Sequence, residues 1–84
     1  MNTIQITSDL LKDQNVNSTE VRIYCFLQTQ ASDSNLSEVT NKLISDELGI
    51  SLKTVTRSMA VLEGEGYIDR KQERNIRYIY FTGK

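Results

Sequence analysis

A tight connection between two helix-like stretches restricts the fold of this chain more than any other feature. Leu43, Ile44 and Leu48 recur at helical spacing, and Gly49 directly follows the last of them. Glycine at this place closes a helix, because it adopts left-handed backbone without steric strain. Ser51 comes two residues later and is a preferred N-cap, so a new helix can begin at once. The sequence therefore predicts two helices that meet at a short corner.

The second of these helices is predicted over residues 52–64 and has two distinct faces. At 100° per residue its apolar side chains fall within an arc of about 80°, which is the expected buried face. Gly64 and Gly66 end the helix. The expected buried residues are Leu52, Val55, Met59 and Leu62, and the opposite face holds Lys53, Arg57 and Ala60, with Thr54 and Thr56 beside them.

Other elements are expected on either side of this pair. A helix is predicted over 17–31, capped by Asn17 together with Glu20 or by Ser18 alone, and the first helix of the pair over 40–48, capped by Thr40. Strand-forming residues flank the polar stretch QERN, which predicts a two-stranded hairpin over 67–82 with Lys71, Arg74 and Arg77 at or near its tip. Residues 1–16 stay open, because Ile4 and Ile6 alternate as in a strand whereas SDLLKD suits a helical turn.

The composition leaves few routes to catalysis. The 84 residues suffice for one small domain, expected to span 1–84. With no histidine and only Cys25, the chain lacks the commonest general base, a Ser/His or Cys/His pair, and the ligands of a zinc finger. No apolar run reaches the roughly 20 residues needed to cross a membrane. We therefore expect a non-enzymatic, cytoplasmic domain without metal or cofactor, in which Cys25 is a small core residue.

Charge is distributed unevenly along the chain. Residues 1–52 carry three Lys or Arg against seven Asp or Glu, whereas residues 53–84 carry seven against four. The net charge of −1 by itself does not indicate a nucleic-acid partner. An acidic first half and a basic second half nevertheless favour one positive face, which a polyanion would need. The alternative is random scatter of charge over a solvated surface.

The stretch TNKLISDELGISLKTVTRSMAVLEGEGYI resembles the winged helix-turn-helix superfamily. Its signature is a helix ending Leu-Gly-Ile-Ser at 48–51, then Thr-Val-x-Arg at 54–57, then Leu-Glu-x-x-Gly-x-Ile at 62–68. With NSTEVRIYCFLQTQASDSN before it and RNIRYIYF after it, the region 17–81 is similar to N-terminal domains of phage and plasmid replication initiators, and GntR-type and MarR-type repressors share the core. The resemblance implies an α+β, mainly α fold, in which three helices precede a two-stranded hairpin called the wing.

The resemblance also implies that helix 52–64 enters the major groove of double-stranded DNA and that the wing reaches the backbone or minor groove. Arg57 has the planar fork that bonds guanine edges or a phosphate, and the helix N-terminus near Ser51 offers free amides to a phosphate. The residues implied to bind DNA are Ser51, Lys53, Thr54, Thr56, Arg57, Lys71, Arg74 and Asn75.

Each of these residues has a purely structural alternative. The alternative for Lys53 and Arg57 is an ordinary solvated helix face, on which Arg57 could pair with Glu63 or Glu65. Asp69 and Glu73 lie between the basic residues of the wing, where cross-strand ion pairs would stabilise the hairpin. Ser51 serves first as a helix cap, and Thr54 could be only a helix-start residue.

Two questions about partners stay open at this stage. The last strand is apolar on both faces, so one face is expected to cover the helices. The other would be exposed in an isolated domain, so either the N-terminal segment or a second subunit is expected to pack there. A homodimer through the C-terminal strand or the N-terminal segment is therefore possible. The favoured function is sequence-specific DNA binding, for replication initiation or transcriptional regulation of a phage- or plasmid-type element. The alternative is a protein-protein interaction module on the same scaffold.

Overall fold

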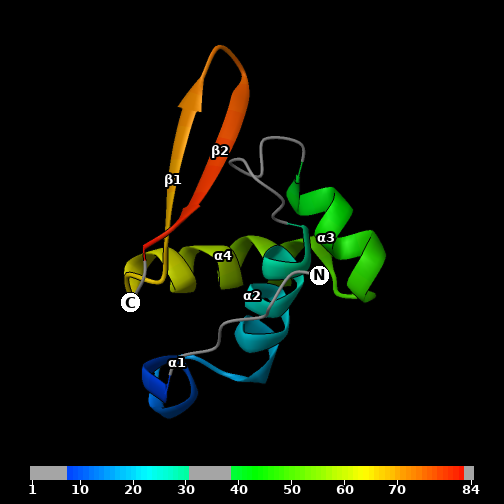
Figure 1. The fold of residues 1–84 in the computed structure, drawn as a ribbon. Coiled ribbons are helices and arrows are strands. Elements are labelled where there is room, and N and C mark those ends of the chain that lie inside the picture. The colour runs from blue at the N-terminus through cyan, green and yellow to red at the C-terminus, as the bar shows by residue number, and fades with distance from the viewer. Residues whose placement is uncertain (1–7, 31–38, 83–84) are drawn as a thin grey trace.

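The computed structural model describes residues 8–30 and 39–82, and they form a mainly helical domain with one hairpin (Figure 1). The helix α4 runs across the middle of the view, and the hairpin rises from its C-terminal end. The mainly helical α+β fold is confirmed, but the described chain has four helices where the sequence predicted three. The elements are α1 (Ser8–Lys12), α2 (Ser18–Gln30), α3 (Asn41–Leu48), α4 (Leu52–Gly64), β1 (Ile68–Glu73) and β2 (Ile76–Phe81).

The additional helix is α1, which forms from the SDLLKD stretch that sequence left undecided. Its Leu10 is buried in the core. The hydroxyl of Tyr67 lies 2.9 Å from the carbonyl oxygen of Asp9 and 3.0 Å from Oδ2 of Asp13, so it donates to either oxygen. Burial, with the nearby Asp13 carboxylate, raises the pKa of Tyr67 to about 12. One short turn of helix is thus held by a residue more than 50 positions away, and Ile4 and Ile6 lie outside the described residues.

The N-terminus of α2 is closed by a capping box. Asn17 Oδ1 accepts the backbone N–H groups of Thr19 at 2.9 Å and Glu20 at 3.1 Å, and the Asn17 N–H donates to Glu20 Oε1 at 3.3 Å. Of the two predicted caps, Asn17 with Glu20 is therefore the one present. The other carboxylate oxygen of Glu20 accepts a hydrogen bond from Ser58 Oγ of α4 at 2.7 Å. Both side chains are buried, so this bond joins the two helices inside the protein.

The corner between α3 and α4 is built as the sequence predicts. Thr40 Oγ1 accepts the Leu43 N–H at 3.1 Å, and Gly49 has φ of 66°, in the left-handed region. Ser51 Oγ accepts the Thr54 N–H at 3.2 Å and so caps α4. A contact from outside the corner completes it, since the Arg22 guanidinium of α2 donates to the Leu48 carbonyl oxygen at 3.1 Å. A cation at the C-terminal end of α3 also complements the helix dipole.

The exit of α4 leads directly into the hairpin. Gly66 has φ of 85°, its N–H donates to the Glu63 carbonyl at 3.0 Å, and the Tyr67 N–H donates to the Leu62 carbonyl at 3.0 Å. This pair of bonds is the Schellman arrangement, in which a left-handed residue ends a helix and reverses the chain. Gly64, by contrast, is the last helical residue. The predicted ending at these two glycines is confirmed, and Gly66 is the one whose backbone requires glycine.

The core forms where α4 packs against its neighbouring elements, and α2 is the element that packs most extensively against it. The ring of Tyr24 makes edge-to-face contacts with Tyr67 and Phe81, at centroid distances of 6.4 and 5.4 Å. Cys25 is only half-buried and is not among the core residues. The buried apolar residues are Leu10, Ile23, Tyr24, Leu27, Val39, Ile44, Val55, Met59, Leu62, Tyr67, Ile68 and Ile79.

Like Cys25, Leu52 is not the core residue that was predicted, because it is 51% exposed. It occupies the first position of α4, where side chains tilt back past the start of the helix. Ser58 is fully buried and continues the inner face with Val55, Met59 and Leu62. The helical period identified the correct side of α4, but it could not show that packing begins only at the second half of its first turn.

The two strands of the hairpin pair antiparallel, and directly opposed residues share a face. Ile68, Ile79 and Phe81 turn toward the core, whereas Ile76 and Tyr80 are exposed on the other face. The tip consists of Arg74 and Asn75, both with positive φ, at 51° and 69°. A two-residue turn of this hand matches the twist of the strands, and Asn tolerates it more readily than Arg.

Arg77 lies near the tip, as predicted, but within β2 and opposite Gln72. Its side chain shares the inward face with Ile79 because the two residues are two positions apart in a strand. Lys71 lies on the outward face opposite Tyr78, three positions before the tip. Charged residues of opposite sign do not face each other across the strands, so the cross-strand ion pairs considered as an alternative do not form within the described hairpin.

We expect Gly49→Ala to lower the free energy of unfolding by about 1 kcal/mol, because an L-residue resists the left-handed backbone. Space is open around this position, so strain alone accounts for the loss. Gly64→Ala is the matched control, since Gly64 has helical backbone and equally open space. It should leave stability unchanged or raise it by up to about 1 kcal/mol in urea denaturation. Equal losses in the two variants would contradict this account of the corner.

We expect Ser58→Ala to lower the free energy of unfolding by roughly 1–3 kcal/mol, because it leaves a buried carboxylate oxygen of Glu20 without its donor. The control is Ser18→Ala, at an exposed position on α2 whose side chain makes no hydrogen bond within the described residues. That change should stay within about 0.5 kcal/mol. A Ser58→Ala protein as stable as the control, measured by thermal and urea unfolding, would show that the buried bond is not needed.

Candidate nucleic-acid interface

The exposed face of α4 presents two long basic side chains. Lys53 and Arg57 lie one helical turn apart, both exposed, and Ala60 continues the same face. Neither basic side chain makes a hydrogen bond or ion pair with any other described residue. Glu63, one of the two carboxylates considered as a partner for Arg57, is bonded to Arg70. The two cations therefore extend from a helix whose other face is locked in the core.

The hydroxyl groups at the start of α4 are committed to the helix itself. Ser51 Oγ accepts the Thr54 N–H, and it also donates to Thr54 Oγ1 at 2.8 Å. Ser51 is exposed and Thr54 is half-buried. These two predicted DNA-binding residues thus shape the N-terminus of α4, where the first backbone amides have no carbonyl partner within the helix and suit an anion.

Thr56 belongs to a hydrogen-bonded chain that joins three elements. Its hydroxyl donates to the Leu52 carbonyl at 3.0 Å and accepts from Asn41 Nδ2 at 3.4 Å. Asn41 Oδ1 in turn accepts from the Arg77 guanidinium at 2.6 Å, and the same guanidinium donates to the Val39 carbonyl at 2.8 Å. Asn41 at the start of α3 therefore links β2 of the hairpin to α4.

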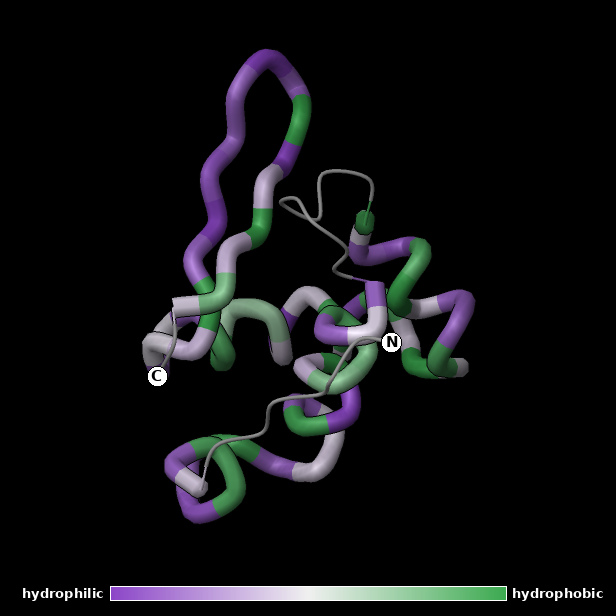
Figure 2. Tube along the Cα trace, in the orientation of Figure 1, coloured by the Kyte–Doolittle hydropathy of each residue, from purple (hydrophilic) through white to green (hydrophobic). Residues whose placement is uncertain are grey.

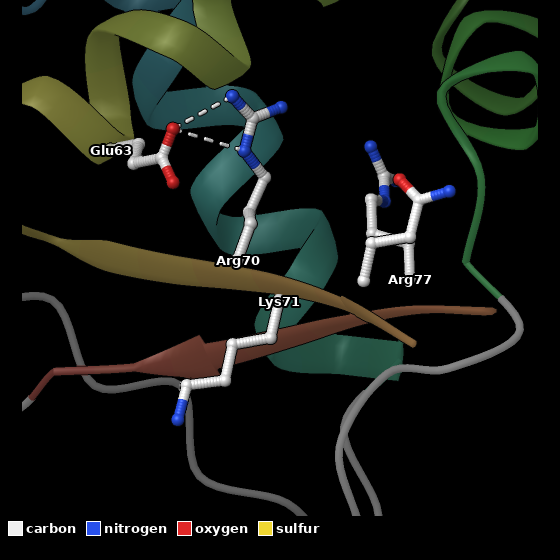
Figure 3. Close-up of a pocket in the computed structure, with 5 residues that line it drawn as sticks. Glu63, Arg70, Lys71 and Arg77 are labelled. Atoms are coloured by element: carbon white, nitrogen blue, oxygen red, sulfur yellow. Dashed lines mark hydrogen bonds and ion pairs between the residues drawn. The ribbon is translucent and has the colours of Figure 1, made fainter. Parts of the chain in front are cut away.

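A second arginine ties the other strand of the hairpin to α4. Arg70 of β1 reaches Glu63 near the end of α4, with NH2 and Nε at 2.8 and 3.3 Å from Oε1 (Figure 3). The hydrogen bond from Arg70 lowers the pKa of the Glu63 carboxyl. Each strand thus carries one arginine that bridges to the helical body, Arg70 on β1 and Arg77 on β2.

An open hollow of about 270 Å³ lies between the hairpin and the C-terminal half of α4. Figure 3 shows Arg70 turned toward Glu63, whereas Lys71 points away on the other side of the hairpin. Arg77 bonds only uncharged acceptors here, and its partial burial, with the positive charge of Arg70, lowers its pKa. The hollow is lined by Glu63, Arg70, Lys71, Gln72 and Arg77, so cations outnumber carboxylates on this side of α4.

The outer half of the hairpin is polar and uncovered, and most of it is drawn as hydrophilic in Figure 2. Lys71, Arg74 and Asn75 are all exposed. None of the three makes a side-chain hydrogen bond or ion pair with other described residues. Of the three basic wing residues predicted near the tip, two are therefore unengaged, and Arg77 is structural.

Sequence reasoning missed the residues that hold these groups in place, namely Asn41, Arg70 and Ser58. Asn41 and Ser58 carry no local signal, because their partners lie 36 and 38 positions away in the chain. The inward place of Arg77, by contrast, does have a local sequence signal. Arg77 alternates with Ile79 and Phe81, so the two-residue period of a strand places it on their inward face.

Comparison with known families identifies this architecture. Residues 17–69 match the family described as winged helix-turn-helix DNA-binding. The chain belongs to the winged helix-turn-helix DNA-binding family. The resemblance to this superfamily is confirmed. No match was found among curated proteins or among solved structures, so the more specific likeness to replication initiators or to GntR and MarR regulators is not shown.

The family match supports DNA binding as the general activity of this domain. It covers α2, α3 and α4 completely and reaches the start of β1. None of the helices in the described part of the chain has the length and apolarity to cross a membrane. The same ranges contain no cluster of three or more residues of the types that hold metal ions.

We expect Arg77→Ala to lower the free energy of unfolding by about 1–2 kcal/mol, because it removes two hydrogen bonds that hold β2 to the start of α3. Amide exchange in the outer hairpin should accelerate relative to α4. Arg74→Ala makes the same chemical change at the exposed tip and should alter stability by no more than about 0.5 kcal/mol. Equal effects of the two substitutions would show that Arg77 does not anchor the wing.

Proposed function

We propose that this domain binds duplex DNA sequence-specifically, with α4 in the major groove and the wing against the flanking backbone or minor groove. The observation that carries the proposal is the unengaged Lys53 and Arg57 face of α4, in a family of DNA-binding domains. The major groove admits a helix and displays a distinct donor and acceptor pattern for each base pair. Arg57 would bond a guanine edge or a phosphate through two parallel N–H groups.

In this proposal the predicted site residues have different tasks. Lys53 and Arg57 supply direct contacts, and Lys71, Arg74 and Asn75 hold the flank of the duplex. The hydroxyl groups at the start of the DNA-facing helix form hydrogen bonds within the protein. They belong to the cap residue Ser51 and to Thr54 and Thr56. Their role is to position the N-terminal turn and its amides next to a phosphate.

The proposed biological use is replication initiation or transcriptional regulation of a phage- or plasmid-type element, in the cytoplasm. The support is the resemblance of residues 17–81 to N-terminal domains of replication initiators and to the core of GntR-type and MarR-type repressors. A single small domain with few phosphate contacts would bind one half-site with modest affinity. A homodimer through the C-terminal strand would supply the second half-site.

A second function is favoured by one specific observation. Ile76 and Tyr80 are 44% and 40% exposed, on the hairpin face turned away from the helices. An exposed apolar strip on a two-stranded sheet suits a protein partner. The alternative is therefore a protein-protein interaction module on the winged-helix scaffold, with the wing as the docking surface.

We expect Arg57→Ala to weaken binding to the selected duplex by about 1–3 kcal/mol, and Lys53→Ala to reduce the slope of log affinity against log salt by about one phosphate contact. The site is first selected from a random duplex library, and affinities are then measured by fluorescence anisotropy at several salt concentrations. Both variants should retain the melting temperature of the unmodified protein, because both side chains are exposed.

Lys12→Ala is the matched control for Lys53→Ala, because Lys12 is exposed on α1, away from the recognition helix and the wing. It should leave both affinity and salt slope almost unchanged. A library selection that enriches no sequence, together with a flat salt response, would contradict DNA binding and favour the protein-interaction alternative.

A further inference from the structure

Leu52 is an apolar side chain left uncovered on α4. It is 51% exposed, although the helical period of α4 predicts burial. The inner face of α4 is complete without it, since Val55, Met59 and Leu62 are fully buried. The fold therefore does not require that Leu52 be removed from water.

The place of Leu52 separates it from the other exposed apolar residues. Large apolar side chains exposed in the described ranges are Leu11, Leu52, Ile76 and Tyr80, and only Leu52 lies on α4. Its sequence neighbours Ser51 and Lys53 are both exposed. Helical side chains tilt toward the N-terminus of their helix, so Leu52 projects past the first turn. In helix-turn-helix proteins it is the N-terminal residues of the recognition helix that contact base edges.

One base alone offers an apolar partner at such a position. The 5-methyl group of thymine lies in the major groove, whereas the other base edges there display polar donors and acceptors. Lys53 and Arg57 recognise acceptors, and the nearby hydroxyl groups of Ser51, Thr54 and Thr56 are already bonded within the protein. Leu52 is thus the large apolar side chain that stays exposed in the first turn, and its chemistry suits a methyl group.

We propose that Leu52 is a specificity-determining residue that reads the 5-methyl group of a thymine in the major groove. The inference rests on the proposed function, in which α4 is the helix that enters that groove. Burial of the methyl against Leu52 adds no charge and no hydrogen bond. Its effect is therefore a preference for thymine at one position, without a change in the salt dependence of binding.

The test compares Leu52→Ala with Leu11→Ala. Leu11 is 65% exposed on α1, so the two variants make the same change at an exposed leucine on and off the recognition helix. Each protein, and the unmodified chain, selects from the same random duplex library. We expect the unmodified chain and Leu11→Ala to require thymine at one position, and Leu52→Ala to lose that requirement while retaining the rest of the site.

The methyl group itself is then removed from the DNA. Replacing the required thymine with deoxyuridine keeps base pairing and deletes only the 5-methyl group. For the unmodified chain and Leu11→Ala this should weaken binding about fourfold, the effect of one buried carbon. For Leu52→Ala the thymine and uracil duplexes should bind equally, with unchanged salt slopes.

Two results would overturn the inference. Selection of the same thymine by Leu52→Ala is one, and an equal uracil effect in all three proteins is the other. Failure of the proposed function gives a different pattern, because then no sequence is enriched by the unmodified chain and Arg57→Ala has no effect. Thermal unfolding serves as the stability check, and Leu52→Ala should melt within a few degrees of the unmodified chain.

Discussion

The hydrogen bond between Ser58 and Glu20 is the constraint on which the presentation of α4 depends. Glu20 closes the N-terminus of α2 through Asn17 with one carboxylate oxygen and holds Ser58 of α4 with the other. A buried carboxylate needs donors on both oxygens, so α4 can dock only with Ser58 turned inward. Arg57 and Lys53 lie about 100° and 140° from Ser58 around the helix. Docking with Ser58 inside therefore leaves both side chains in solvent.

Some basic side chains in the second half of the chain bond within the protein, and others remain available to a ligand. Arg70 and Arg77 bridge the two wing strands to the helical body, and Arg22 from the acidic half caps α3. A two-stranded hairpin alone is marginally stable, so these bridges set the direction in which its tip points. Fewer cations therefore remain for a polyanion than the composition suggests. Those without a partner in the described chain include Lys53, Arg57, Lys71 and Arg74.

The helix α4 presents both polar and apolar groups in its first two turns. Its hydroxyl groups are bonded within the protein, which stiffens the turn and leaves its backbone amides free for a phosphate. Its long side chains and Leu52 are the groups that would distinguish base pairs under the proposed function. Under the proposed function, specificity would then depend on a few polar contacts to base edges together with one methyl contact, and affinity on a small number of phosphates.

The amino-acid sequence alone fixes where helices begin, end and turn. The caps at Asn17, Thr40 and Ser51 and the left-handed backbone at Gly49 and Gly66 all follow from residues within a few positions of one another. Caps and turns are local interactions, so their signal is contained in short stretches of sequence. The order of the elements followed from these signals together with hydrophobic periodicity, and the winged-helix class came from the resemblance of residues 17–81 to that superfamily.

Tertiary structure alone decided which side chains are held and which are free. The burial of Ser58, the inward place of Arg77 and the formation of α1 each depend on a partner more than 30 positions away. The exposure of Leu52 depends on where the neighbouring elements stop covering α4. Periodicity gives the direction of a side chain around its helix, but burial also requires a neighbour at the same height along the axis, and only the packed structure supplies it.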